Sequence, residues 1–163
     1  MAALTDWARA LLEGRHYATL ATLNTDGTSH LTPVWYLFRD QQLFVGASSS
    51  SRKVKNVVAR PTASLVVDLR RSGAERWVSG AGPVTLLRGE ESRTIVAAIQ
   101  ERYLTAAALA DPRVGPGFAG ADDVTLCIRP ATWRSWAAAD LDAQFFGGLL
   151  SATPEKWFRP VDV

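Results

Sequence analysis

The chain has 163 residues, 47% hydrophobic and 21% charged, which is typical of a folded globular protein and excludes a disordered chain. Its 18 basic and 16 acidic side chains leave a net charge of +2, too small to indicate a nucleic-acid partner, and no apolar stretch approaches the roughly 20 residues of a membrane span. With a single cysteine, Cys127, and no basic leader before an apolar run, we expect a cytoplasmic protein without disulfides, built as one domain over residues 1–163.

The first elements read as a helix followed by a hairpin. Thr5 can cap a short helix within residues 1–14, where apolar side chains recur at helical spacing. Alternating apolar and polar residues then predict strands at 17–23 and 30–38, joined by turn residues. Pro33 interrupts the second strand and cannot donate to a ladder, so it indicates an edge, a bulge or a place where something other than a strand docks.

The middle of the chain continues with strands and two helices. A basic helix is expected at 52–59 and an amphipathic one at 90–104. Residues 111–123, rich in glycine and proline, read as a loop, and the tail 138–163 has no assigned structure. The further predicted strands are 43–47, 63–69, 124–129, and 76–87, this last one broken or bulged by Gly80, Gly82 and Pro83.

Six short strands with few helices determine the expected fold class. The β-α-β alternation of a parallel, doubly wound sheet is missing. The sequence therefore predicts a mainly β protein, a closed or nearly closed antiparallel barrel with peripheral helices.

The segment from Gly46 to Asn56 carries the chemistry. Four serines stand where a strand passes into the basic helix, and the free N–H groups of a helix start favour an anion. No acidic residue occurs between Asp40 and Asp68. A phosphate fits this segment, because its oxygens need several donors and its charge needs compensation. A flexible loop whose last serine, Ser51, caps a solvated helix is the structural alternative.

The order and spacing of several segments resemble the pyridoxamine 5′-phosphate oxidase-like superfamily, and more narrowly its flavin/deazaflavin oxidoreductases. The resemblance covers roughly residues 17–87 and rests on four runs: His30-Leu-Thr-Pro-Val-Trp-Tyr-Leu-Phe38, Leu43-Phe-Val-Gly-Ala47, Ser51-Arg-Lys-Val-Lys-Asn-Val57 and Arg60-Pro-Thr-Ala-Ser-Leu-Val-Val67. It implies a split β-barrel homodimer that holds FMN or the deazaflavin coenzyme F-420 between its subunits.

The resemblance also implies which residues bind that cofactor. The segment from Ser51 to Lys53 would receive the phosphate, the backbone of Pro33 to Trp35 would face the ring, and two tryptophans would line the groove from the partner subunit. The expected set is Thr32, Pro33, Val34, Trp35, Ala47, Ser48, Ser51, Arg52, Lys53, Lys55, Asn56, Trp77 and Trp136. Hydride transfer needs binding and orientation more than a dedicated acid or base, so no catalytic side chain and no metal site are expected.

Two functions from different classes remain open at this point. The first is an oxidoreductase that moves hydride between FMN or F-420 and a small, flat, hydrophobic acceptor. The second is a non-enzymatic flavin, haem or biliverdin binding protein of the same fold. Binding to nucleic acid through the basic helix is disfavoured by the nearly balanced charge.

Overall fold

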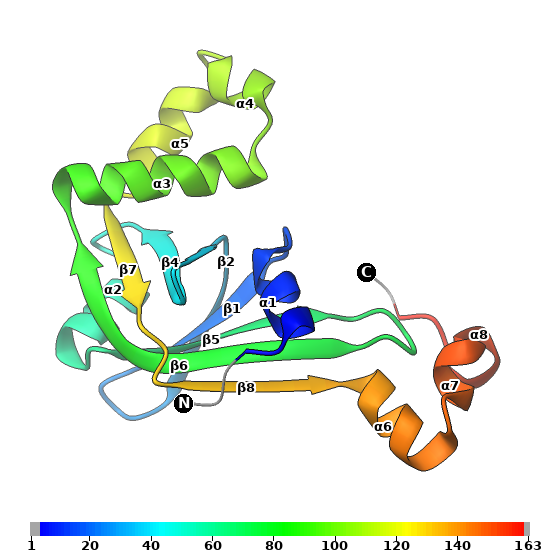
Figure 1. Ribbon diagram of the computed structural model, residues 1–163. Helices are drawn as coiled ribbons and strands as arrows, with labels where there is room; N and C mark the ends of the chain where they lie inside the picture. The colour runs from blue at the N-terminus through cyan, green and yellow to red at the C-terminus, as the bar shows by residue number, and fades with distance from the viewer. Residues whose placement is uncertain (1–3, 162–163) are drawn as a thin grey trace.

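The computed structural model describes residues 4–161, which form eight antiparallel strands and eight helices (Figure 1). The strands are β1 (Ala18–Leu23), β2 (Ser29–Val34), β3 (Leu37–Arg39), β4 (Gln42–Ala47), β5 (Thr62–Leu69), β6 (Arg76–Leu87), β7 (Val124–Ile128) and β8 (Thr132–Ala137). The helices are α1 (Asp6–Glu13), α2 (Arg52–Ala59), α3 (Gly89–Tyr103), α4 (Ala106–Ala110), α5 (Gly115–Ala121), α6 (Ala138–Phe146), α7 (Leu149–Ala152) and α8 (Pro154–Trp157). The strand order is β2-β1-β5-β6-β7-β4-β3, with β8 added beside β6.

Strand β6 joins the two halves of a split β-barrel. Its first part pairs with β5 on one side and β8 on the other, while Val84 to Leu87 pair with β7. The ribbon bends between these two parts and rises toward α3 (Figure 1). The predicted break in this strand is therefore wrong: β6 is continuous over twelve residues. Its glycines serve close packing instead, since a Cβ at Gly80 would lie 2.7 Å from the Trp133 ring.

The inside of the barrel is filled by alternate side chains of the strands together with two helices. On β1 and β5 every second residue, such as Leu20 and Leu65, is fully buried, as period-2 alternation predicts. Thr5 caps α1 by accepting a hydrogen bond from the Ala8 amide, 3.3 Å away. That helix buries Leu11 and Leu12 against the same core.

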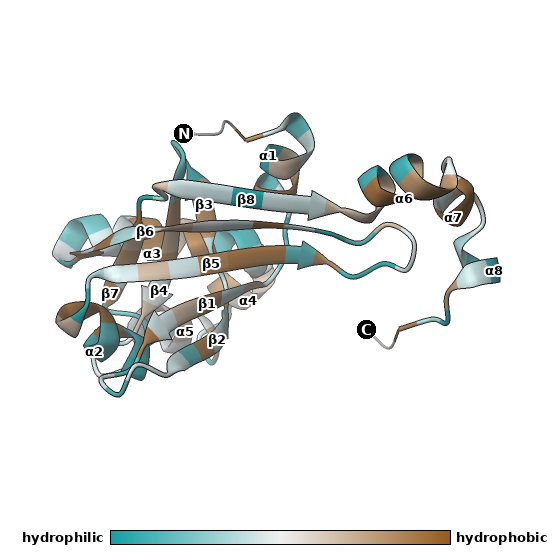
Figure 2. Cartoon of the chain, turned by 90° about the horizontal axis from the view of Figure 1, so that it is seen from below, coloured by the Kyte–Doolittle hydropathy of each residue, from teal (hydrophilic) through white to brown (hydrophobic). Residues whose placement is uncertain are grey.

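The opposite side of the sheet β2-β1-β5-β6-β8 is not covered by a helix in the part of the chain that the structure describes (Figure 2). We call this side the outer face. Its side chains are mostly small or apolar, and the strand register places them opposite one another across the sheet. They include Thr19, Ala21, Leu23, Leu31, Pro33, Ser64, Val66, Trp77, Ser79, Ala81, Arg134 and Trp136.

Three further predictions are corrected by the structure. The predicted strand 30–38 is two strands, because the chain leaves β2 at Trp35 and Tyr36 and then pairs with β4 as β3. The predicted loop 111–123 contains the helix α5. The tail from Ala138 is helical and forms α6, α7 and α8. The edge position expected for Pro33 is confirmed, since β2 lies at one end of the strand order.

Candidate functional site

The break between β2 and β3 opens onto a cavity of about 170 Å³. It lies between one edge of the barrel and the helices α3 and α5. The predicted ring-binding segment and one predicted phosphate ligand line the same space. The lining residues are Pro33, Val34, Trp35, Gly46, Lys53, Val96, Ile99, Gln100, Phe118, Ala121 and Asp122.

Trp35 is held in this cavity by an aromatic stack. Its ring lies parallel to Tyr103 of α3, with centroids 5.1 Å apart and an interplanar angle of 3°. Phe118 of α5 stacks on Trp35 with a centroid distance of 5.8 Å. The Gln100 amide donates to the Phe118 carbonyl oxygen at 2.7 Å and ties α5 to α3. Three elements distant in sequence thus fix the orientation of one indole.

The residue after Trp35, Tyr36, anchors the segment between β2 and β3 to helix α1. Tyr36 is fully buried, and its hydroxyl donates to the Leu12 carbonyl oxygen at 2.8 Å. Burial raises the pKa of this phenol far above its usual value, so it stays a neutral donor. Arg102 donates to the carbonyl oxygens of Glu13 and Gly14 at the end of the same helix, α1. The strand break is therefore fixed by contacts to α1 and is not a loose loop.

The serine turn leads into α2 as the sequence indicates. The Ser51 amide donates to the Ser48 carbonyl oxygen at 2.9 Å, and the Ser48 and Ser50 hydroxyls lie 2.8 Å apart. Ser51 makes no side-chain cap bond; its Oγ is buried and has no hydrogen-bond partner within residues 4–161. A buried hydroxyl without a partner is costly, and it stands beside the free N–H groups of the helix start.

The basic residues of α2 point in different directions. Lys53 is half-buried and lines the cavity, and it forms no ion pair among the described residues. Arg52 and Lys55 are exposed and lie outside the cavity lining. The helical rotation of about 100° per residue separates Lys53 from Lys55 by more than half a turn. Only one of the three predicted cations is therefore brought to the cavity within the subunit.

Two carboxylates that are remote in sequence lie at the serine turn. Asp123 accepts hydrogen bonds from the Ser49 amide and the Ser49 hydroxyl, both at 2.6 Å, and these bonds lower the pKa of Asp123. Asp122 lines the cavity beside Gly46, where an added Cβ would lie 2.7 Å from its carboxylate. The sequence has no acidic residue between Asp40 and Asp68, but the folded structure places two carboxylates at this turn. The segment before β7 brings Asp122 and Asp123 there.

The charge state of Asp122 is set by its half-buried position. Burial raises the pKa of its carboxyl above the usual value, the ammonium of Lys53 opposes this rise, and the carboxylate of Asp123 adds to it. Asp122 has no hydrogen-bond partner among the described residues. The cavity thus holds one cation and one carboxyl group that takes up protons more readily than a solvated one.

Several predicted site residues are used elsewhere within the subunit. Asn56 is buried and its amide donates to Thr22 Oγ1 and to Asn24 Oδ1, both at 3.0 Å, so its donors hold α2 to the β1–β2 hairpin. The Ala47 side chain is buried in the core. The Thr32 hydroxyl is hydrogen-bonded to His30 Nε2 at 3.0 Å. None of these three residues lines the cavity, whereas Pro33 and Gly46, the neighbours of Thr32 and Ala47, do.

The two predicted tryptophans lie on the outer face. Trp77 on β6 and Trp136 on β8 are register partners, and Trp136 is 39% exposed. Neither lines the cavity with Trp35. Their predicted approach to a cofactor from a partner subunit stays a prediction.

The residues that the sequence interpretation missed are Gln100, Phe118 and Asp122. They come from α3, α5 and the residue that follows α5. Phe118 is the one aromatic residue in a stretch rich in glycine and alanine, which was the available signal for a packed element. Within residues 4–161 there is no cluster of three metal-ligating side chains, and no helix is long and apolar enough to cross a membrane.

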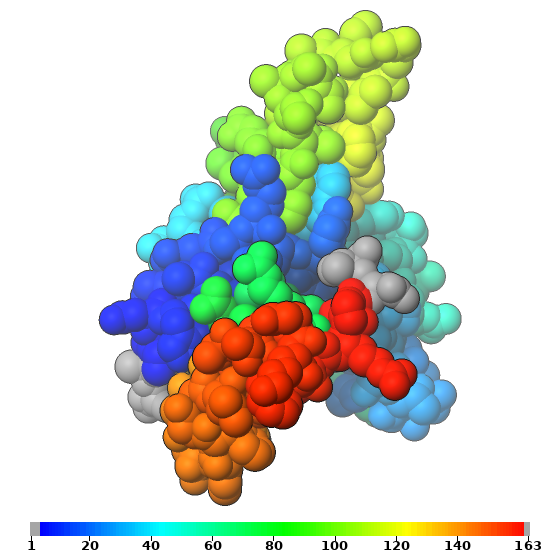
Figure 3. All heavy atoms as spheres, turned by 90° about the vertical axis from the view of Figure 1, so that its right-hand side faces the viewer, coloured from blue at the N-terminus to red at the C-terminus, as the bar shows by residue number. Residues whose placement is uncertain are grey.

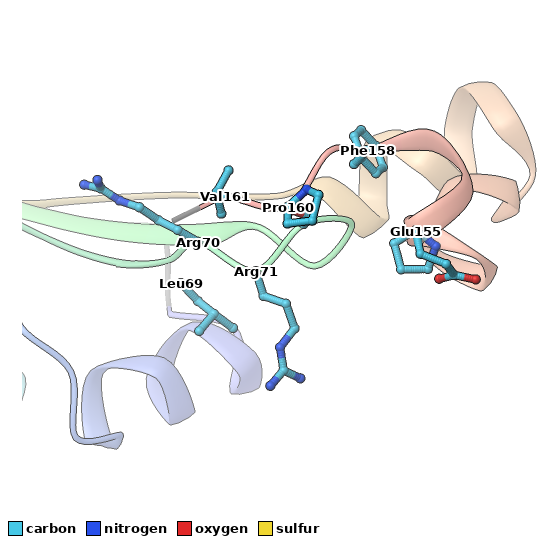
Figure 4. Close-up of a pocket in the computed structure, with 9 residues that line it drawn as sticks. Leu69, Arg70, Arg71, Glu155, Phe158, Pro160 and Val161 are labelled. Carbon is cyan, nitrogen blue, oxygen red and sulfur yellow. The ribbon is translucent and has the colours of Figure 1, made fainter. Parts of the chain in front are cut away.

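A larger cavity of about 500 Å³ lies far from these residues, between the β5–β6 hairpin and the C-terminal segment (Figure 4). Leu69, Phe158 and Val161 give it apolar walls. Of its two arginines, Arg70 is paired with Asp68. None of the predicted site residues lines it.

Comparison with known proteins gives the family. A search of curated protein sequences finds no match. Among solved structures, the conserved hypothetical protein Rv2991 from Mycobacterium tuberculosis is 25% identical, with a TM-score of 0.69 over 86% of this chain and 88% of that one. An F420 reductase (21% identity, TM-score 0.62, 80% of this chain and 98% of that chain) and the haem storage protein HutZ from Vibrio cholerae (15%, 0.61, 83% and 95%) share the fold. A sequence model described as pyridoxamine 5′-phosphate oxidase matches residues 4–137, and the chain therefore belongs to the pyridoxamine 5′-phosphate oxidase family.

Proposed function

We propose that this protein is an oxidoreductase that binds FMN or coenzyme F-420 and transfers hydride between that cofactor and a small, hydrophobic acceptor. The observation that carries the proposal is the cavity in which Pro33, Val34 and Trp35 meet Lys53 at the start of α2. A flat ring needs an apolar slot with backbone polar groups, and its phosphate needs a cation and N–H donors. The cavity has apolar lining residues and one cation, Lys53, which belongs to the first turn of α2.

The donor set at α2 fits a phosphate. The buried Ser51 hydroxyl lacks a partner in the described chain, and the first-turn N–H groups of α2 have no acceptor within the helix. Lys53 supplies a positive charge that Asp122 offsets only in part, since burial favours the neutral form of that carboxyl. We expect Ser51, Lys53 and the helix start to hold the phosphate, with Arg52 at the rim.

The cofactor, when bound, supplies the hydride chemistry. The task of the chain is to bind and orient. Trp35, fixed between Tyr103 and Phe118, keeps the backbone of the ring-binding segment in one conformation. The apolar residues of α3 that line the cavity, Val96 and Ile99, exclude water from it.

We also propose that the protein acts as a homodimer with the cofactor at the subunit interface. The cavity of about 170 Å³ is below the roughly 300–1,000 Å³ of sites that enclose an organic ligand. A second subunit would supply the missing wall. The uncovered outer face, which begins with Pro33 and ends with Trp136, offers the contact surface.

A non-enzymatic tetrapyrrole binding protein is the second candidate, supported by the shared fold with a haem storage protein. The two histidines, His16 and His30, are the natural axial ligands to consider. His30 is already hydrogen-bonded to Thr32. Burial lowers the pKa of His16, and the positive charge of nearby Arg102 lowers it further. Neither lines the cavity, which favours the flavin-type cofactor.

Titration of the purified protein with FMN, F-420 and haemin separates the candidates. We expect quenching of flavin or deazaflavin fluorescence at micromolar concentration, and reduction of quinone or enone acceptors by the reduced cofactor. A tight Soret complex with haemin, without measurable binding of FMN or F-420, would overturn the proposed oxidoreductase. Binding of the cofactor without reduction of any acceptor would indicate a non-enzymatic cofactor-binding protein and would contradict the proposed oxidoreductase.

A further inference from the structure

The C-terminal segment Ala138–Val161, here called the arm, is a folded addition to the family domain. It contains α6, α7 and α8 and lies beyond the residues that match the family. Asp142 is 2% exposed and accepts hydrogen bonds from the Leu150 amide (3.0 Å), the Ser151 amide (2.7 Å) and the Ser151 hydroxyl (2.6 Å). These bonds lower the pKa of Asp142 against the effect of its burial. The arm therefore has one defined shape.

The surface of the arm is unusually apolar. Twelve large hydrophobic residues of the described chain are exposed, and seven of them lie on the arm although it makes up only a small part of the chain. Such a concentration on a folded element marks a contact surface. The seven are Leu141, Phe145, Phe146, Leu149, Trp157, Phe158 and Val161.

The arm follows β8 at one end of the outer face, and its first helix, α6, projects to the same side. In Figure 1 α6 extends below the level of β8, on the side of the sheet that carries no helix, whereas α7 and α8 lie at or above that level. In Figure 3 the orange first part of the arm is the lowest part of the molecule, and its red C-terminal part lies higher. The arm follows β8 directly, and the exposed Trp136 of β8 and Leu141 of α6 line the same cavity. A molecule that covers the outer face as far as Trp136 is therefore placed beside α6.

We propose that the arm packs against a second copy of this chain. In the dimer, the arm of each subunit contacts the partner that covers the outer face of the same subunit. We call this contact the clasp. This inference rests on the homodimer of the proposed function and extends it to residues outside the family match. A twofold dimer uses the same surface on both copies, so that surface must contain both contacting parts. This chain carries both: exposed Leu23, Leu31 and Trp136 on the outer face, and the arm with its exposed aromatic residues.

Two apolar cavities where the arm joins the barrel support a second copy of this chain as the molecule that covers the arm. A cavity of about 220 Å³ lies between Trp136, Leu141 and Phe158, and the cavity of about 500 Å³ adjoins it through Phe158 (Figure 4). The subunit does not fill these apolar spaces with its own side chains.

The test removes the apolar surface of the arm and measures assembly. The variant Phe145→Ser/Phe146→Ser/Leu149→Ser is compared with wild type and with the control Gln144→Ala, an exposed polar residue on the same helix. Sedimentation velocity over a wide concentration range gives the dimer dissociation constant. We expect the triple variant to weaken the dimer by about 100-fold or more, since a central apolar contact is commonly worth a factor of ten. The control should change it by less than about threefold.

Two further measurements keep the outcome unambiguous. The circular dichroism and thermal unfolding of the triple variant at low concentration should equal those of wild-type monomer, because the three side chains are exposed in the subunit. Amide hydrogen exchange in wild type should show protection of 138–157 that is lost on dilution. A monomeric wild type at 100 µM, a concentration on the order of the weakest stable dimers, would overturn both the homodimer and the clasp.

A dimeric wild type whose dissociation constant is unchanged in the triple variant, with an arm that exchanges freely, would overturn the clasp alone. The arm would then face a molecule other than a second copy. The homodimer of the proposed function would stand in that case, so the two failures are distinguishable.

Discussion

Replacing Lys53 by alanine tests the phosphate site most directly. Lys53 is the cation that lines the cavity, and a charge-assisted hydrogen bond to phosphate contributes about 1.5–3 kcal/mol. Because about 1.4 kcal/mol corresponds to a factor of ten, binding of FMN should weaken by roughly tenfold to a hundredfold. The loss should lie toward the upper end, since the variant also leaves Asp122 without the opposing charge of Lys53.

The chain offers a matched control in Lys55. Lys55→Ala removes the same charge from the same helix, but Lys55 is exposed and lies outside the cavity. We expect its effect on FMN affinity to stay within about threefold, the size of a screened surface charge. Riboflavin, which lacks the phosphate, should bind wild type and Lys53→Ala equally. Thermal unfolding should be nearly the same for both variants, within about 0.5 kcal/mol.

The assay is fluorescence quenching at fixed ionic strength, with F-420 measured in parallel. The double variant Lys53→Ala/Asp122→Asn adds a coupling measurement, and we expect it to recover part of the lost affinity because both act on one phosphate. Equal losses in Lys53→Ala and Lys55→Ala would show that only net charge matters. Wild type that binds riboflavin as tightly as FMN would refute the phosphate site altogether.

Three other predictions concern the surroundings of the site. The pKa of Asp122 is raised in the folded state, so ionisation of this carboxyl destabilises the fold as pH rises through that pKa. The variant Asp122→Asn should therefore have a higher Tm than wild type at pH 7 and the same Tm at pH 3. An equal Tm at both pH values would contradict a raised pKa. Gly80→Ala should lower the free energy of unfolding, measured in urea, by about 1–3 kcal/mol, because the added Cβ would meet the Trp133 ring. As a control, Gly117→Ala on α5 should raise the free energy of unfolding by about 0.4–1 kcal/mol, because no atom lies within 4 Å of the added Cβ. Trp35→Ala removes two stacked pairs and should cost about 1–3 kcal/mol while changing acceptor turnover more than FMN affinity, with Trp35→Phe as the milder control.

Local patterns were sufficient for most of the barrel. Alternation identified β1, β5 and the hairpin partners because one side of each strand is buried, as Leu20 and Leu65 show. The end of β2 was missed, since the apolar run continues unbroken through Trp35 and Tyr36. What ends the strand is the hydrogen bond from Tyr36 to Leu12, twenty-four positions away, and no local window contains both partners.

The site was harder to predict than the fold for the same reason. The serine turn and α2 are contiguous, so their position at a strand-to-helix junction was readable. Asp123 reaches Ser49 across 74 positions, which only the pairing of β4 with β7 brings about. Helix α5 has a composition typical of loops, and it is held by Phe118 on Trp35, a contact that depends on the finished tertiary structure.

Cofactor binding and subunit assembly are expected to be coupled in this protein. The cavity beside Trp35 is smaller than sites that enclose an organic ligand, and Pro33 belongs both to its lining and to the outer face. A ligand that binds a site completed by two subunits binds the dimer in preference to the monomer, and it must tighten the dimer by the same factor. The arm, which contacts no cofactor within its own subunit, then acts on affinity through assembly alone. A change on the arm should weaken FMN binding at low protein concentration and leave it unchanged where the protein is fully dimeric, whereas a change at Lys53 should weaken it at every concentration.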